Sequence, residues 1–231
     1  MVDFSKFEKR LKISFEDKKL LKQAFTHRSY INENPKLGIA HNERLEFLGD
    51  AVLELIITEY LFDKYPEHTE GELTSYRSAL VNSVIMSHIA KDLEINDFLL
   101  LSKGESKDIG KARQYILANT LEAFIGALYL DQGYKIAKNF VAKHIFSHVD
   151  EIVVKKLWKD SKSFVQEKSQ EYLGITPSYK VLKEIGPDHD KHFVVGIFFG
   201  DELIAKGKGK SKQEAEQKAA TEALNIKKWE D

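Results

Sequence analysis

The sequence predicts an all-α domain followed by a small α+β domain. From residue 4 to about residue 154 the apolar residues recur at intervals of three and four, which is typical of amphipathic helices. Beyond Asp160 the pattern changes to a helix, three strand-like runs and a final helix, in the order α-β-β-β-α. We therefore expect a helical domain over residues 1–150, a linker over 151–159 and the smaller domain over 160–228.

Turn-forming residues separate the expected helices of the first domain. They occur at Asn34-Pro35 with Gly38, at residues 66–71, at Lys103-Gly104 and at residues 131–133. Glycine, proline and asparagine interrupt helices for steric reasons, so these positions predict short helix–helix connections.

In the second domain the pattern predicts helices over residues 163–173 and 211–224. Strands are expected over 179–185, 193–199 and 203–207. The first helix should stop at Gly174. Ser211 and Glu214 have the spacing of a capping box, which marks the start of the last helix.

Composition excludes several classes of site. The chain has no cysteine, so disulfides, thiolate nucleophiles and Cys-ligated zinc are excluded, and any metal must be held by oxygen or imidazole. The first ten residues lack the apolar segment of a signal peptide, and no run of about 18 apolar residues free of charge follows. We expect a cytoplasmic protein with no membrane partner. The net charge is −1 and neither domain is basic overall, so binding of nucleic acid would need cations gathered on one face.

Two acidic residues, Glu46 and Asp50, lie four positions apart in the segment ERLEFLGDAVLELI (residues 43–56). On a helix they share one face, with Cβ atoms about 5–6 Å apart. Such a pair could ligate a metal. Alternatively Glu43, Glu46, Asp50 and Glu54 form the solvated stripe of an ordinary amphipathic helix, and the periodicity alone does not separate these interpretations.

A second helix, over residues 115–130, carries Asn119, Thr120 and Glu122 in a nearly continuous apolar run. Burial of an ionised Glu122 would cost several kcal/mol unless a positive charge compensates it. Asn119 and Glu122 share a face, so two packed helices would present four oxygen ligands, a set suited to Mg²⁺. The alternative is a buried Glu122 that is hydrogen-bonded to a neighbour or paired with a lysine.

Several segments resemble conserved blocks of the ribonuclease III family, and the resemblance covers nearly the whole chain. They are HNERLEFLGDAVL (residues 41–53), ILANTLEA (116–123), THRSY (26–30), EGEL (70–73) and RSALVN (77–82).

The resemblance implies an endoribonuclease that cuts double-stranded RNA in rRNA and mRNA processing. It implies that Glu46, Asp50 and Glu122, with Asn119 in the fourth position, bind Mg²⁺, for which Mn²⁺ could substitute. Asp50 and Glu122 would be catalytic, and the metal would activate water for in-line attack and stabilise the leaving 3′ oxygen. The ends would be 5′-phosphate and 3′-hydroxyl with a short 3′ overhang.

The resemblance also implies a homodimer in which each protomer cuts one strand. Phe47 would be an apolar knob that docks into the partner, although an aromatic residue inside a helix is more often core. Glu70 would line the RNA cleft, or else simply favour the dipole of the helix that it precedes. His27 could suggest general-base catalysis, but we expect it to be structural. No small-molecule organic cofactor is expected.

The second domain carries lysines that alternate with glycines in KGKGKSK (residues 206–212), just before a helix. This is either a phosphate site at a helix start or a solvated hairpin end. Together with the turn GPDH (186–189) and the helix start KSFVQE (162–167), it resembles a double-stranded RNA-binding domain. That resemblance implies recognition of A-form shape over about 16 base pairs. The RNA-binding residues carried over are Gln166, Glu167, His189, Lys210 and Lys212.

Two positions depart from the family patterns. Gln213 stands where Lys or Arg is usual, which predicts one phosphate contact fewer. Asn119 stands where Asp is usual, so the site has three carboxylates where four are expected. We expect an active enzyme that needs more Mg²⁺. The alternative is a double-stranded RNA-binding protein whose cleavage is weak or lost.

Overall fold

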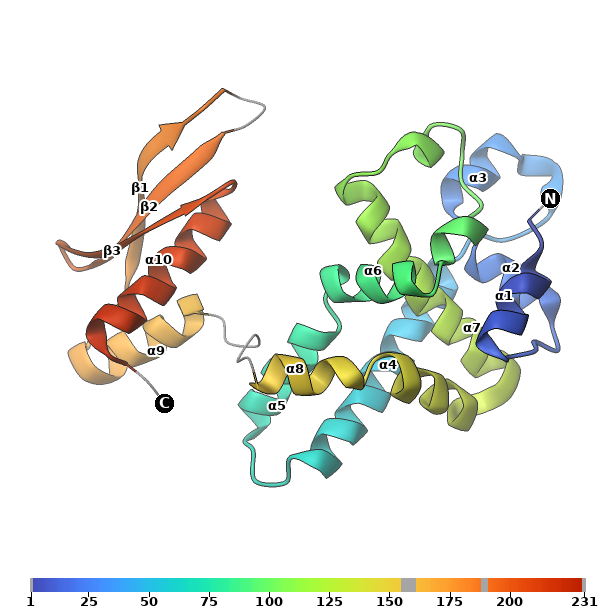
Figure 1. Ribbon diagram of the computed structural model, residues 1–231, viewed down its shortest axis with the longest axis horizontal. Coiled ribbons are helices and arrows are strands. Elements are labelled where there is room, and N and C mark those ends of the chain that lie inside the picture. The colour runs from blue at the N-terminus through green and yellow to red at the C-terminus, as the bar shows by residue number, and fades with distance from the viewer. Residues whose placement is uncertain (1, 155–160, 188–190, 230–231) are drawn as a thin grey trace. The chain divides into compact units, whose positions relative to one another are not determined.

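The computed structural model describes residues 2–154, 161–187 and 191–229. The chain divides into two compact units, Met1–Trp158 and Lys159–Asp231, and each is described by itself (Figure 1). In the described part of the chain, no helix has the length and apolarity needed to cross a membrane.

Among its described residues the first unit consists of helices joined by short connections, as predicted from the apolar periodicity. Three short helices, α1 to α3, precede the long α4, and the long α7 follows α5 and α6. The helices are α1 (Phe4–Leu11), α2 (Lys18–Ala24), α3 (Arg28–Glu33), α4 (Glu43–Lys64), α5 (Glu70–Leu80), α6 (Ser83–Asp92), α7 (Lys111–His144) and α8 (Ser147–Val154), with 3₁₀ turns η1 (Pro35–Leu37), η2 (Ile95–Phe98) and η3 (Glu105–Lys107). Helix α8 therefore continues into the segment that was expected to be a linker.

Local sequence explains where several helices begin. Asp3, Asp17 and Asn82 each accept a hydrogen bond from a backbone N–H in the first turn of α1, α2 and α6. Thr69 and Glu72 form a reciprocal capping box at the start of α5. These side chains satisfy N–H groups that have no partner within the helix.

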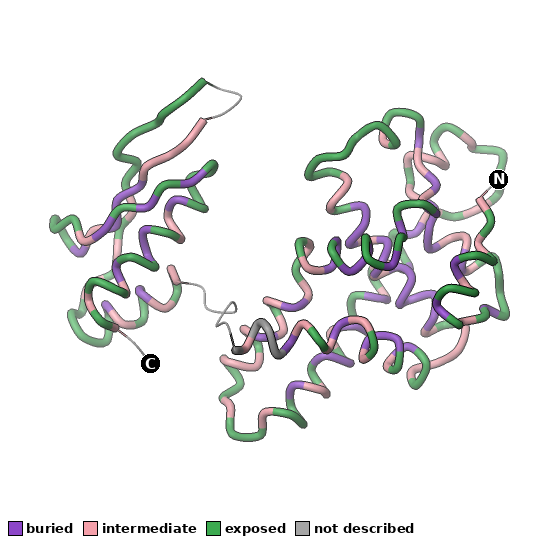
Figure 2. The backbone as a smooth tube through the Cα atoms, in the orientation of Figure 1, coloured by how far each residue is buried: buried purple, intermediate pink, exposed green. Residues whose placement is uncertain are grey.

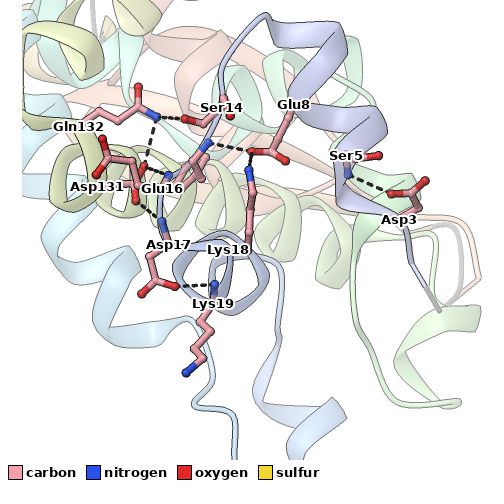
Figure 3. A network of polar contacts seen from close by, with 11 residues as sticks. Asp3, Ser5, Glu8, Ser14, Glu16, Asp17, Lys18, Lys19, Asp131 and Gln132 are labelled. Atoms are coloured by element: carbon pink, nitrogen blue, oxygen red, sulfur yellow. Dashed lines mark hydrogen bonds and ion pairs between the residues drawn. The ribbon is translucent and has the colours of Figure 1, made fainter.

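The predicted joint at residues 131–133 is a kink inside α7. Gly133 has φ 79° and ψ 178°, a backbone conformation that favours glycine. The carboxylate of Asp131 accepts the backbone N–H groups of Glu16 (2.9 Å) and Asp17 (2.8 Å), and the Gln132 amide donates to the Ser14 carbonyl (2.7 Å) (Figure 3). The kink therefore holds the connection between α1 and α2 against α7.

The core of this unit is centred on α4 and α7, and buried positions follow both helices (Figure 2). The prediction that the helix over residues 115–130 is buried is confirmed, because almost all side chains between its two ends are buried. Aromatic rings join the N-terminal helices to α7: Phe7 packs edge-on against Phe25 and Phe124, with ring centroids 4.9 and 5.3 Å apart. These contacts make α7 the rigid centre of the unit.

The second unit has the predicted α-β-β-β-α order. It consists of α9 (Ser161–Leu173), β1 (Ser178–Ile185), β2 (His192–Phe199), β3 (Glu202–Gly209) and α10 (Lys212–Lys227), and the antiparallel sheet has the strand order β1-β2-β3. A small core joins both helices to one face of the sheet: Val165, Ile197, Phe199, Ala205, Ala219, Ala220 and Ala223.

The alternation of lysine and glycine in β3 follows from this packing. A Cβ atom on Gly207 would lie 2.1 Å from the Ala215 carbonyl oxygen, and one on Gly209 would lie 2.6 Å from the Ala215 nitrogen. The strand therefore needs glycine on the side that faces α10. Lys206 and Lys208 are exposed and point to the opposite side of the sheet.

Candidate active site

Two glycines bring α4 and α7 into backbone contact. A Cβ atom on Gly49 would lie 1.7 Å from the carbonyl oxygen of Glu122, and one on Gly126 would lie 2.3 Å from the carbonyl oxygen of Leu45. Neither distance can be accommodated without moving a helix backbone. The sequence thus sets the separation of the two helices at this point.

This contact brings together the four residues expected to ligate a metal. Glu46 and Asp50 flank Gly49 on α4, and Asn119 and Glu122 lie on the facing stretch of α7. Asp50 is exposed, whereas the other three are partly buried. Of the four acids in the alternative solvated stripe, Glu43 and Asp50 are exposed and Glu46 and Glu54 are partly buried.

Burial and mutual repulsion dominate the electrostatics of the site. Burial, followed by the charges of Asp50, Glu46 and Glu54, raises the pKa of Glu122 to about 8. Burial and the charge of Glu43 also raise the pKa of Glu46, while a hydrogen bond from the Asn119 amide acts in the opposite direction. Among the described residues Glu122 has no ion pair or side-chain hydrogen bond, so the alternative of a Glu122 that is hydrogen-bonded to a neighbour or paired with a lysine is not supported.

The donor set fits a hard cation that is completed by other ligands. Within the described ranges, no three His, Cys, Asp or Glu side chains form a ready-made metal cluster. Mg²⁺ commonly takes one or two carboxylates and fills its shell with water and substrate phosphate. The repulsion that raises the pKa of Glu122 is also the interaction that a divalent cation would relieve.

Phe47 is 81% exposed, so it is not a core residue. Leu55 (51% exposed) and Phe62 (70%) follow at intervals of eight and seven on α4 and lie on the same side of the helix. Sequence reasoning missed Leu55 and Phe62, because α4 also has a fully apolar buried face. The signal that could have found them is that α4 carries more apolar residues than one face can hold.

Glu70 lies apart from the four clustered residues. It is the first residue of α5, accepts a hydrogen bond from Thr74 (3.1 Å), and lines a cavity of about 430 Å³ with Phe62 and Arg77. His27 is the N-cap of α3, where its side chain accepts the Ser29 N–H, in keeping with the expected structural role.

In the second unit the structure separates the lysine cluster into two groups. Lys210 and Lys212 are exposed at the start of α10, whereas Lys206 and Lys208 lie on the other side of the sheet. The expected capping box is only half formed: Ser211 accepts the Glu214 N–H, but the Glu214 carboxylate accepts the Lys210 N–H (2.8 Å). This bond fixes the backbone of Lys210 in front of the helix.

The first helix of this unit presents Gln166 and Glu167 to solvent. Gln166 and Gln213 line one cavity of about 230 Å³, so α9 and the start of α10 lie next to each other. His189 lies outside the described residues.

The first unit has carboxylates on two packed helices, and the second, with the order α-β-β-β-α, has lysines at a helix start. Together these features are typical of an enzyme that acts on nucleic acid. A family model described as "Ribonuclease-III-like" matches residues 17–149 of this chain. A second, described as "Double-stranded RNA binding motif", matches residues 161–227. The chain belongs to the ribonuclease III family and is an endoribonuclease for double-stranded RNA.

Relatives and solved structures agree with this assignment. Ribonuclease 3 of Nitratiruptor is 44% identical over 228 residues, which cover 99% of this chain and 98% of that relative. Ribonuclease 3 of Bacillus licheniformis is 44% identical over 221 residues, 96% of this chain and 88% of the relative. The nuclease domain of the Campylobacter jejuni enzyme superimposes with a TM-score of 0.57 at 43% identity, over 63% of this chain and 97% of that chain. The family is metal-dependent, and these similarities do not favour a binding protein without cleavage.

Proposed function

We propose that Glu46, Asp50 and Glu122, together with the carbonyl oxygen of Asn119, hold Mg²⁺ and that Asp50 and Glu122 are catalytic. The observation that carries this proposal is the Gly49–Gly126 contact, because it places acidic residues of two helices together at a partly buried position. Mn²⁺ should be able to substitute, since it accepts the same oxygen ligands.

The bound cation would activate water for attack on the phosphodiester and stabilise the leaving 3′ oxygen. The chain's own residues prepare the site. Both helices are fixed by the core. Cleavage of this kind leaves 5′-phosphate and 3′-hydroxyl ends.

The exposed apolar residues of α4 support a homodimer as the working form. Phe47, Leu55 and Phe62 form an exposed apolar row on a long helix, which is typical of an interaction surface. The solved nuclease domain from Campylobacter jejuni is described as having a region involved in dimer formation. In a dimer each protomer would cut one strand, leaving a short 3′ overhang.

The second unit would supply affinity for the duplex. Lys210 and Lys212 would contact phosphates, Gln166, Glu167 and His189 would reach the minor groove, and Glu70 would line the cleft of the nuclease unit. Such an enzyme would act in the cytoplasm on rRNA and mRNA precursors.

The test is Glu122→Gln, assayed on a long perfect RNA duplex with Mg²⁺ and with EDTA. The variant should lose cutting by at least about 100-fold while binding the duplex as the natural chain does, because its second unit is unchanged. Asp63→Asn is the matched control: it removes the same charge from an exposed position on α4 and should cut normally. Undiminished cutting by Glu122→Gln would contradict the proposed ligand set.

A further inference from the structure

A cavity of about 590 Å³ lies beside the proposed metal site. It is lined from four elements and shares Glu46 and Asn119 with that site; the other residues that matter here are His27, Arg28, Glu43 and Glu105. This volume is within the range of pockets that hold small ligands, about 300–1,000 Å³. A group of the substrate could therefore enter next to the scissile phosphate.

The hydrogen bonds of His27 fix which ring nitrogen carries its proton. Nδ1 accepts the backbone N–H of Ser29 (3.3 Å) and lies 2.8 Å from the Ser29 hydroxyl oxygen. Because Nδ1 accepts an N–H and so carries no proton, the Ser29 hydroxyl donates to it, while the hydroxyl oxygen accepts the backbone N–H of Ser102 (3.1 Å). Burial lowers the pKa of His27 and favours the neutral ring. The ring is thus protonated on Nε2, which has no hydrogen-bond partner among the described residues and can donate to a ligand.

A carboxylate lines the same cavity as this donor. Among the charged groups that act on His27, the carboxylate of Glu105 has the largest effect, ahead of Arg28 and Glu43. The cavity therefore pairs a neutral N–H donor with a carboxylate acceptor. A hydroxyl group, which both accepts and donates, satisfies this pair. A phosphate fits this lining less well, because Glu43, Glu46 and Glu105 outweigh the positive charge of Arg28.

We propose that this cavity binds the ribose of a nucleotide beside the cut, with His27 Nε2–H donating to the 2′-hydroxyl oxygen and Glu105 accepting the hydroxyl proton. This inference deepens the proposed function, because it rests on cleavage occurring at the adjacent carboxylates. The 2′-hydroxyl distinguishes RNA from DNA, so the contact gives the nuclease unit its own selectivity for RNA.

The test uses duplexes that carry one 2′-deoxynucleotide at successive positions around the cut, cleaved by the natural chain and by two variants of His27. In His27→Asn the side chain can still cap α3 but lacks the distant N–H, whereas His27→Gln keeps an N–H near the Nε2 position. At one position the deoxy substitution should slow the natural chain and His27→Gln by at least about fivefold, because the hydroxyl makes two hydrogen bonds and each contributes about 1 kcal/mol. His27→Asn should cut the all-ribose duplex more slowly than the natural chain, and the deoxy substitution should slow it less, because only the bond to Glu105 remains to be lost.

A control variant and a second test variant complete the experiment. His88→Asn, at an exposed position on α6, should behave as the natural chain, and Glu105→Ala should have a reduced deoxy sensitivity because the bond from His27 remains. Equal deoxy sensitivity of the natural chain and His27→Asn at every position, or none in the natural chain, would overturn the inference. The metal proposal is tested separately, by whether Glu122→Gln still cuts. If it does, the cleavage rates of the natural chain and the His27 variants can still be compared.

Discussion

Replacing Glu122 by glutamine should make the metal-free protein more stable while it abolishes cutting. The carboxyl of Glu122 has a pKa of 4.5 in the unfolded chain and about 8 in the folded protein. Below pH 4.5 it is protonated in both states, so glutamine has no advantage. Between pH 4.5 and about 8 the folded state holds a proton that the unfolded state releases, so the stability of the natural chain falls as pH rises. Above pH 8 the full cost of the buried charge remains.

The size of the effect follows from the same shift. Each pKa unit corresponds to about 1.4 kcal/mol, so the shift sets an upper limit of about 5 kcal/mol. Because Glu122 is only partly buried and its neighbours can relax, we expect about 1–2 kcal/mol. For a chain of this size that is an increase of about 3–6 °C in Tm.

The assay is thermal unfolding of both proteins in EDTA at pH 5, 7 and 9, repeated with Mg²⁺. The gain of Glu122→Gln should be small at pH 5 and largest at pH 9. Added Mg²⁺ should raise the Tm of the natural chain and leave the variant nearly unchanged, because a ligand stabilises only the protein that binds it. Asp63→Asn should show no such pH dependence. A variant that is less stable than the natural chain at pH 9, or equally stabilised by Mg²⁺, would refute the reasoning.

Three further predictions concern other parts of the chain. Gly49→Ala should lower the free energy of unfolding by about 1–3 kcal/mol and reduce cutting, because the added Cβ forces the two helices apart; an unchanged melting curve would show that the contact is looser than described. Asn119→Asp should lower the Tm in EDTA, since it adds a charge beside Glu46. The same variant should need a lower Mg²⁺ concentration for half-maximal cutting. An unchanged Mg²⁺ dependence would make Asn119 a packing residue. Lys210→Ala with Lys212→Ala should weaken binding to all duplex sequences and reduce by about two the slope of log binding constant against log salt concentration, measured by titration at several salt concentrations. The control pair, Lys206→Ala with Lys208→Ala, should change that slope less. A loss of affinity that depends on base sequence would contradict phosphate contact.

The sequence predicted the elements better than it predicted how closely they pack. Apolar periodicity was sufficient for the helices and strands, and the spacing of Glu46 with Asp50 and of Asn119 with Glu122 indicated shared faces. Nothing in that spacing says which face of α4 meets which face of α7. The answer depends on Gly49 and Gly126, and a lone glycine in a helix has no single meaning in a sequence.

Two other features show the same limit. The kink in α7 was predicted only as a joint, because the partners of Asp131 lie more than a hundred positions away in the sequence. The exposed row on α4 was hidden for a different reason: the periodicity of an apolar face does not show whether solvent, the core or a second chain covers it.

The lysine and glycine alternation of β3 also restricts how the second unit can misfold. Sliding β3 by one residue along β2 would turn every side chain to the other face of the sheet. Lysines would then be driven against Ala215 and Ala219, where even a methyl group on Gly207 is too large. A pairing of β3 with β2 that is shifted by one residue is therefore excluded by steric clash with α10. In the observed alignment the glycines of β3 face α10, and Lys210 lies directly before the start of that helix.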